Sequence, residues 1–389
     1  MRRPTPLAAL LVGFVLLGMP GAALGVAWPD MAESFGRNLG DLAVISVVSG
    51  VAYGTMSLAG GRLTQRFSAG RLMVLGAASA VFALAIIALA DSFWWAVAAA
   101  VPLGFSGGAI DAIGNGYFAV FRGARAMGAI HAAYGLGAAI APFYLTWLIA
   151  NGVSWRIGFA SLAVAEVALV VLMALVASEI RMPMEGRTDR PVRWGRKRLL
   201  GLSVWTFFIY SGVELSIGAW AFTLLSEGQM ISVAIAGTAV SLHWVALFAS
   251  RLLLSYLGDR LPANLTIGVS AVGVLVGVGL VWWNPYAAVT VAGLVIAGFF
   301  SGPIFPLETT LTSARFGAEY APWAVGYQLG GATFSVAVFP LLIGYMVNTR
   351  GPLAIAPILF VISILLLVSV EALRVASERE RSADAPVAV

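Results

Sequence analysis

The stretch Gly104-Phe-Ser-Gly107-Gly108-Ala-Ile-Asp111-Ala-Ile-Gly114-Asn115 places a carboxylate and an amide in the middle of an apolar run from about 93 to 121. A run of this length can cross a bilayer as a helix. A charge inside hydrocarbon costs at least ~2.5 kcal/mol, so Asp111 is a candidate functional residue. Asp111 and Asn115 share one helix face because they are four residues apart, and the glycines allow close approach of a neighbouring helix or a ligand. The stretch predicts one wall of a polar cavity.

The composition indicates a polytopic membrane protein. Of the 389 residues, 60% are hydrophobic and 11% are charged, whereas soluble domains are nearer about 45–50% apolar and about 25% charged. The chain has no cysteine, which excludes disulfides, cysteine catalysis and thiolate metal sites. The net charge of +5 comes from basic residues in loops between apolar runs. That distribution is a topology signal and does not indicate a nucleic-acid partner.

Twelve apolar runs are long enough to span a membrane, and helices are expected because backbone groups in lipid must be satisfied within the segment. A basic linker at 181–198 separates six runs from six. We therefore predict an N-terminal six-helix bundle (1–180), a cytoplasmic linker (181–198), a C-terminal six-helix bundle (199–376) and a cytoplasmic tail (377–389). The predicted spans are 6–32, 40–62, 72–90, 93–121, 126–150, 155–178, 199–225, 231–257, 264–283, 286–314, 321–348 and 352–374.

The distribution of basic residues predicts the orientation. With the N-terminus inside, only Arg37, Arg156 and Arg350 of the 23 lysines and arginines fall outside, and the other twenty, Arg251 and Arg315 among them, are counted as cytoplasmic. An excess of this kind is typical of cytoplasmic loops. We expect a multi-pass protein of the cell (inner) membrane with both termini in the cytoplasm.

The two halves repeat at an offset of 194 residues. Gln65-Arg66-Phe67 corresponds to Asp259-Arg260-Leu261, and Gly104-Phe105 corresponds to Gly298-Phe299. Parallel six-span repeats predict a two-bundle transporter with its site between the halves. The loop at 60–67 resembles the signature of the major facilitator superfamily between spans two and three, although it has glutamine at 65 where an aspartate is usual. The resemblance implies that Arg66, Asp259 and Arg260 gate the closed state; alternatively, they are solvated turn charges.

Span seven reads Tyr210-Ser-Gly-Val-Glu214-Leu-Ser216-Ile-Gly218-Ala-Trp220. Glu214 lies near the middle of the span, and Tyr210 and Gly218 are one turn away on the same face. The functional hypothesis is that Glu214 binds a proton or a polar solute and that Trp220 stacks on the solute. The alternative is that Glu214 is a structural partner of another helix and Trp220 an interfacial anchor.

Spans five, ten and eleven supply the remaining candidates. His131 can change charge near neutral pH and so relay a proton, although a structural role close to the cytoplasmic arginines is also open. Tyr134 is a candidate ligand on the same face. Gln328 can donate and accept hydrogen bonds to a hydroxylated solute. Glu308 is expected to pair with Arg315 or Arg251 in a gate, and the prolines of Gly302-Pro303-Ile304-Phe305-Pro306 free backbone groups that a cavity tolerates.

These motifs together resemble the fucose–galactose–glucose:proton symporter family over nearly the whole chain, most specifically in span seven. The motifs are Asp111/Asn115, His131-x-x-Tyr134-Gly135-x-Gly137, the span-seven sequence, residues 302–306 and Gln328-x-Gly330-Gly331. The resemblance implies proton-coupled uptake of a sugar-like solute with a membrane carboxylate as proton carrier. The lack of basic residues deep in the predicted core argues against a strongly anionic substrate.

The resulting prediction is an all-α transporter of twelve helices that works by alternating access. Asp111, Glu214 and His131 are the proton-coupling candidates, and the solute-binding candidates are Asn115, Tyr134, Tyr210, Trp220 and Gln328. The alternative is proton-driven efflux of amphipathic drugs or lipids. Since the chain lacks a His-Glu-x-x-His motif and paired aspartates at ligand spacing, we do not expect an enzyme. We expect a monomer in the lipid bilayer whose partners are a small solute and protons, with no metal or cofactor beyond the proton gradient.

Overall fold

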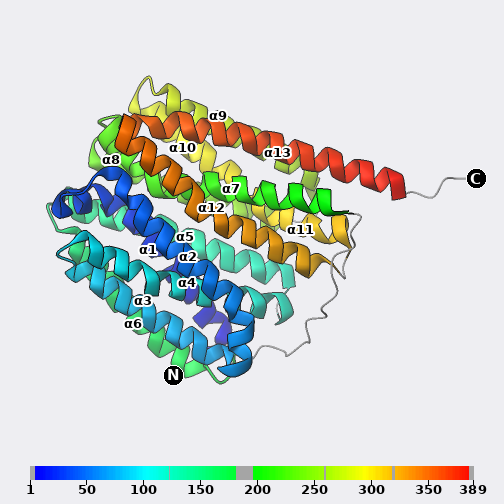
Figure 1. Ribbon diagram of the computed structural model, residues 1–389, viewed down its shortest axis with the longest axis horizontal. Coiled ribbons are helices and arrows are strands. Elements are labelled where there is room, and N and C mark those ends of the chain that lie inside the picture. The colour runs from blue at the N-terminus through cyan, green and yellow to red at the C-terminus, as the bar shows by residue number, and fades with distance from the viewer. Residues whose placement is uncertain (1–4, 122, 181–195, 258–259, 318–319, 385–389) are drawn as a thin grey trace, which may run out of the picture.

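The computed structural model describes residues 5–121, 123–180, 196–257, 260–317 and 320–384, and these form helices and turns without a strand (Figure 1). Within this part of the chain twelve helical segments are long and apolar enough to span a membrane. The predicted all-α architecture of twelve spans is confirmed. The helices are α1 (Pro6–Phe35), α2 (Leu42–Arg66), α3 (Ala69–Leu89), α4 (Phe93–Phe121), α5 (Gly123–Ala150), α6 (Trp155–Val176), α7 (Lys197–Thr223), α8 (Val233–Leu257), α9 (Ala263–Trp283), α10 (Ala287–Ser301), α11 (Ile304–Phe316), α12 (Ala321–Arg350) and α13 (Ile355–Asp384), with short turns η1 (Leu39–Asp41), η3 (Leu224–Gly228) and η5 (Pro352–Ala354).

The last helix extends beyond its predicted limit of 374. α13 continues to Asp384, because Arg374 forms ion pairs with Glu371 and Glu378, three and four residues away. Pairs at these spacings lie side by side on a helix and stabilise it. The helix therefore runs through the predicted boundary at 376. The domain limits stay predictions, and most of the predicted linker, 181–195, lies outside the described residues.

The helices of each half pack mainly against one another. In the first half α1 packs on α5, α2 on α4, and α3 on α4 and α6; in the second, α7 packs on α12 and α13, α8 on α10, and α9 on α10 and α13. Small residues allow these approaches: a Cβ at Gly137 of α5 would lie 1.8 Å from the carbonyl oxygen of Val15 in α1. Figure 1 shows α1–α6 gathered below α7–α13.

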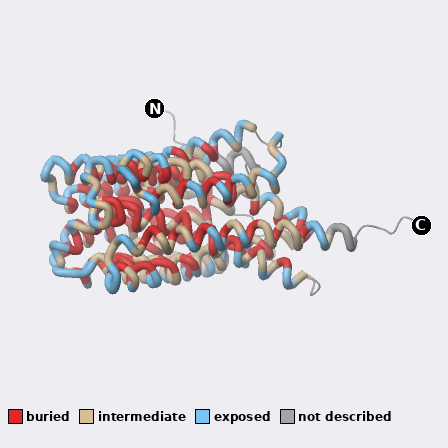
Figure 2. Tube along the Cα trace, turned by 90° about the horizontal axis from the view of Figure 1, so that it is seen from above, coloured by how far each residue is buried: buried red, intermediate tan, exposed pale blue. Residues whose placement is uncertain are grey.

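Large apolar side chains face outward as well as inward. Leu58, Leu89 and Val164 are 77%, 82% and 71% exposed, and Figure 2 shows exposed residues along the outer faces of helices whose inner faces are buried. A soluble surface of this size would carry far more charge. The outward-facing leucines and valines fit a surface in contact with lipid.

Contacts between the halves are made by α5 with α8, α2 with α12 and α1 with α7. Polar contacts join the halves at the end of the molecule where η1 lies, which we call the η1 end. There the Gly40 N–H donates to Asn348 Oδ1 at 2.8 Å, and Asn348 Nδ2 donates to Asp41 Oδ1 at 3.1 Å. Arg37 holds the other oxygen of Asp41 at 2.8 Å. The two halves are thus tied together at this end.

Candidate functional site

The first carboxylate of the site, Asp111, is held on α4 by two donors. The Tyr53 hydroxyl of α2 donates to Oδ2 at 2.6 Å, and the Asn115 amide donates to Oδ1 at 2.8 Å. Tyr53 reaches Asp111 because α2 lies directly against the glycines of α4: a Cβ at Gly104 or Gly108 would lie 2.1 Å or 2.4 Å from a carbonyl oxygen of α2. The close approach expected from the glycines is confirmed. Tyr53 was not among the predicted site residues.

The second carboxylate, Glu214 on α7, belongs to a buried network. Its Oε2 accepts a hydrogen bond from the Tyr210 hydroxyl one turn earlier, and its Oε1 lies 3.4 Å from the Arg251 guanidinium of α8. Glu214 and Arg251 are only 8% and 7% exposed. A buried charge of this kind is tolerated when an opposite charge and hydrogen bonds accompany it.

The break between α10 and α11 completes the network. Pro306 has no N–H, so the carbonyl of Gly302, four residues earlier, has no helical partner. Arg251 Nε donates to that carbonyl oxygen at 3.3 Å, and the Tyr210 hydroxyl lies 3.0 Å from the carbonyl oxygen of Ser301. The predicted span 286–314 is therefore two helices, and the backbone freed at the break forms part of the site.

Arg251 corrects two expectations. It was counted among the cytoplasmic charges, but it lies inside α8, six residues before Leu257, and pairs with Glu214 rather than with Glu308. The expectation that the core lacks deep basic residues is wrong for the same reason. The sequence held a signal for this, because Arg251 falls within the run 231–257 that was itself predicted to span the membrane.

Helix α5 brings the two carboxylate groups into one region. The Tyr134 ring lies 6.4 Å from the ring of Trp244 on α8, and Tyr134 interacts electrostatically with Asp111, Glu214 and Arg251. His131, one turn earlier, lies 5.8 Å from the ring of Phe305. The structure thus gathers Asp111, Tyr134, His131 and the Glu214 network where the two halves face each other.

Two predicted solute-binding residues are enclosed. Gln328 is 0% exposed, and its amide donates to Ser203 at 2.6 Å and to Thr312 at 3.0 Å, which ties α12 to α7 and α11. Trp220 is also 0% exposed and lies in the main hydrophobic core. A solute could contact these side chains only if the helices around them moved apart. Their roles in binding therefore stay predictions.

The predicted gating residues are dispersed. Glu308 pairs with Arg315 within α11, both almost fully buried, which selects one of the two expected partners. Arg66 and Arg260 are exposed, and the Arg66 guanidinium lies 5.9 Å from the ring of Phe67. Asp259 lies outside the described residues, so the latch stays a prediction.

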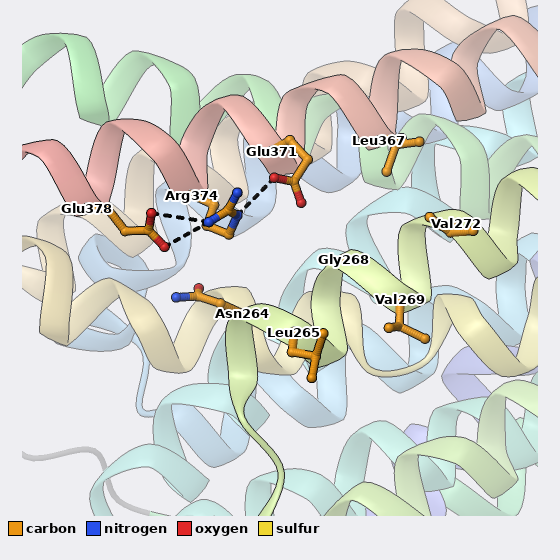
Figure 3. A pocket seen from close by; sticks show the side chains of 9 residues that line it. All are labelled: Asn264, Leu265, Gly268, Val269, Val272, Leu367, Glu371, Arg374 and Glu378. Atoms are coloured by element: carbon orange, nitrogen blue, oxygen red, sulfur yellow. Dashed lines mark hydrogen bonds and ion pairs between the residues drawn. The ribbon is translucent and has the colours of Figure 1, made fainter.

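A separate hollow lies on the surface between α9 and α13 (Figure 3). Leu265, Val269 and Leu367 contribute apolar side chains to it, and Arg374 is bridged there by two glutamates. Its charged side chains are more than a third exposed and are paired with one another. The hollow belongs to the second half alone and is distinct from the site between the halves. The described residues contain no group of three or more potential metal ligands.

Comparison with known sequences identifies the family to which this architecture belongs. The profile of the family described as Major Facilitator Superfamily matches residues 10–226 and 202–388. The chain is 24% identical to "Bypass of stop codon protein 6" of Saccharomyces cerevisiae over 88% of its length and 77% of that protein. It is 26% identical to "Probable actinorhodin transporter" of Streptomyces coelicolor (92% and 67% covered) and 26% identical to "Sodium-dependent glucose transporter 1A" of Mus musculus (86% and 89% covered).

Solved structures share the fold. A bacterial homologue of the human lysosomal transporter Spinster, in an inward-facing and occupied conformation, superposes with a TM-score of 0.68 at 15% identity, covering 96% of this chain and 94% of that one. The human organic anion transporter MFSD10 (TETRAN) gives 0.70 at 14% identity, covering 94% and 100%. At these identities the similarity establishes the fold alone.

Proposed function

The chain belongs to the major facilitator superfamily, and from that premise we propose that it is a proton-coupled symporter of a sugar-like or other small polar solute. It is a multi-pass membrane transporter and not an enzyme. The observation that carries the proposal is a pair of carboxylates, one from each half, each held by a tyrosine hydroxyl near the facing surfaces of the bundles. Such intramembrane carboxylates mark ion pathways.

The mechanism follows from the cost of moving these charges. Protonation neutralises a carboxylate and removes the penalty of enclosing it in a low-dielectric site. Proton binding at Asp111 and Glu214 thereby permits the two halves to rock around a bound solute. Asn115 bonds Asp111, and Tyr134 interacts electrostatically with the same carboxylate. The Oδ1 of Asn115 has no hydrogen-bond partner among the described residues. That oxygen is available to accept from a solute hydroxyl.

The test is solute-driven proton flux in proteoliposomes. A thermal-shift screen of sugars, polyols, sugar acids and drugs first selects a solute that binds the purified protein. Wild-type protein is expected to acidify the lumen when that solute is added outside, whereas Asp111→Asn and Glu214→Gln abolish the coupled flux. Asp91→Asn, at an exposed turn, is the matched control and should retain it. Full gradient-driven uptake by both core variants would show that neither carboxylate carries the proton. Uptake that requires a sodium gradient would identify sodium as the coupling ion.

A second candidate function is proton-driven efflux of amphipathic compounds. The relative in Streptomyces coelicolor that is named as a probable actinorhodin transporter favours it. The same vesicles decide the direction: solute that accumulates with the inward proton gradient supports symport, and solute that is expelled against it supports efflux. We further propose that the protein works as a monomer in the cell (inner) membrane with cytoplasmic termini and without a bound cofactor.

A further inference from the structure

Arg251 of α8 has a buried guanidinium with an incomplete set of partners. Its Nη2 lies 3.4 and 3.5 Å from the two oxygens of Glu214 and 3.5 Å from the Tyr210 hydroxyl. Charge-assisted N–H···O bonds are typically about 2.7–2.9 Å long, so this pair is loose. Its Nη1 makes no hydrogen bond among the described residues. The guanidinium is therefore held in place by Gly302 and the surrounding packing without being saturated by Glu214.

The positive charge of Arg251 is balanced by Glu214. The titratable groups that face the pair are Tyr210 on α7, His131 and Tyr134 on α5, and His243 on α8. Glu214 is the acid that contacts Arg251, so it neutralises the guanidinium when ionised. If Glu214 takes up a proton, Arg251 remains as a buried cation without a counter-charge, which is strongly unfavourable.

An anionic group on the solute would restore the balance. From this geometry we propose that Arg251 binds a carboxylate of the solute in exchange for Glu214, so that the transported solutes are small polar monocarboxylates such as sugar acids. The planar guanidinium offers a fork of donors that matches a carboxylate. Protonation of Glu214 and entry of the anion leave the net charge of the site unchanged. This inference rests on the proposed function and specifies its substrate class.

Neighbouring groups suit the polar and apolar parts of such a solute. The rings of Tyr134 and Trp244 meet edge to face, with centroids 6.4 Å apart, beside the pair. Trp244 is 3% exposed, yet its Nε1–H has no partner among the described residues. A buried donor without a partner is costly. Its position next to Tyr134 offers the solute a further hydrogen bond.

The test uses the purified full-length chain and matched pairs of compounds that differ by a carboxylate: glucuronate and glucose, gluconate and glucitol, lactate and propane-1,2-diol, benzoate and benzyl alcohol. Thermal shift and calorimetry are recorded at an acidic and an alkaline pH. At least one carboxylate is expected to bind more tightly than its neutral partner, and more tightly at acidic pH. Arg251→Gln should weaken that binding by about tenfold or more, and Glu214→Gln should abolish its pH dependence.

Controls separate binding from folding. Arg71→Gln removes an exposed arginine of α3 and should bind as wild type does. The double variant Glu214→Gln/Arg251→Gln removes both charges, so no unpaired charge is left in the core. It should fold and should lose the preference for carboxylates. The proposal is overturned if no carboxylate in the panel stabilises the protein more than its neutral partner, or if the folded double variant keeps the preference. Proton-coupled transport of a neutral solute would refute this inference and leave the proposed function standing.

Discussion

Asp111 and Glu214 are each paired with a tyrosine hydroxyl, but the two arrangements differ. Tyr53 and Asp111 lie on different helices, so their bond at 2.6 Å joins α2 to α4. Tyr210 and Glu214 lie one turn apart on α7, and their bond joins no helices. A hydrogen bond to a buried carboxylate offsets part of its desolvation cost. Loss of the first bond should therefore affect stability as well as transport.

Tyr53→Phe keeps the ring and removes the donor. Hydrogen bonds to charged groups contribute about 1.5–3 kcal/mol, so we expect a lower free energy of unfolding and slower solute-driven proton flux. Thermal unfolding in detergent and the vesicle assay measure the two effects. Tyr345→Phe, at a 67% exposed position of α12, serves as the matched control. Equal unfolding temperatures and fluxes for the two variants would contradict a role for the Tyr53–Asp111 bond.

At the scale of the elements, small residues set how closely the helices pack. Gly137 and Gly18 bring the backbones of α5 and α1 together, since a Cβ at either would lie within 2.2 Å of a carbonyl oxygen of the other helix. In this way α5 is fixed with Tyr134 facing the second half. By contrast, Gly330 of α12 has open space where a Cβ would be placed.

Gly137→Ala should therefore force α1 and α5 apart. Overpacking of this kind costs about 1–3 kcal/mol, and the displacement of α5 should also reduce transport. Gly330→Ala adds the same methyl group without a clash, and alanine has the higher helix propensity by up to about 1 kcal/mol. Thermal unfolding of the two variants decides: a Gly137→Ala protein as stable as Gly330→Ala would show that the α1–α5 contact is not tight.

At the scale of the whole molecule, the halves are tied together at the η1 end. Asn348 of α12 bonds both Gly40 and Asp41, and the backbones come so close that a Cβ at Gly344 would lie 2.4 Å from the carbonyl oxygen of Gly40. Alternating access requires the halves to separate at each end in turn. The proposed alternating-access cycle therefore requires this contact to break.

A covalent bond at the same place should stop the cycle. Because the chain has no cysteine, the pair Asp41→Cys/Asn348→Cys supplies the only two thiols. Oxidation is expected to cross-link them and abolish transport, and reduction should restore it. Each single variant treated with the same oxidant is the control, since it loses the native contact without a cross-link. Transport at the full rate by the cross-linked protein would show that the η1 end does not open.

The amino-acid sequence by itself determined the twelve spans, because the length and apolarity of each run dictate helices in lipid. It also singled out Asp111, Glu214, Tyr134 and Tyr210, because polar groups inside apolar runs are expensive and therefore conspicuous. The glycines of α4 indicated a close neighbour, although they did not identify it as Tyr53 of α2. These conclusions depend on neighbours along the chain, where helical spacing governs which side chains share a face.

Only the tertiary structure decided which side chains meet. Arg251, which was counted among the cytoplasmic charges, pairs with Glu214 inside the protein. Gln328, which was predicted to bind solute, forms hydrogen bonds with Ser203 and Thr312 within the second half. Helical periodicity describes one helix at a time, whereas these contacts depend on how α7, α8 and α12 are placed by their packing. The break at Gly302 shows the same limit: the prolines predicted freed carbonyls, but the partner came from a helix some fifty residues away in sequence.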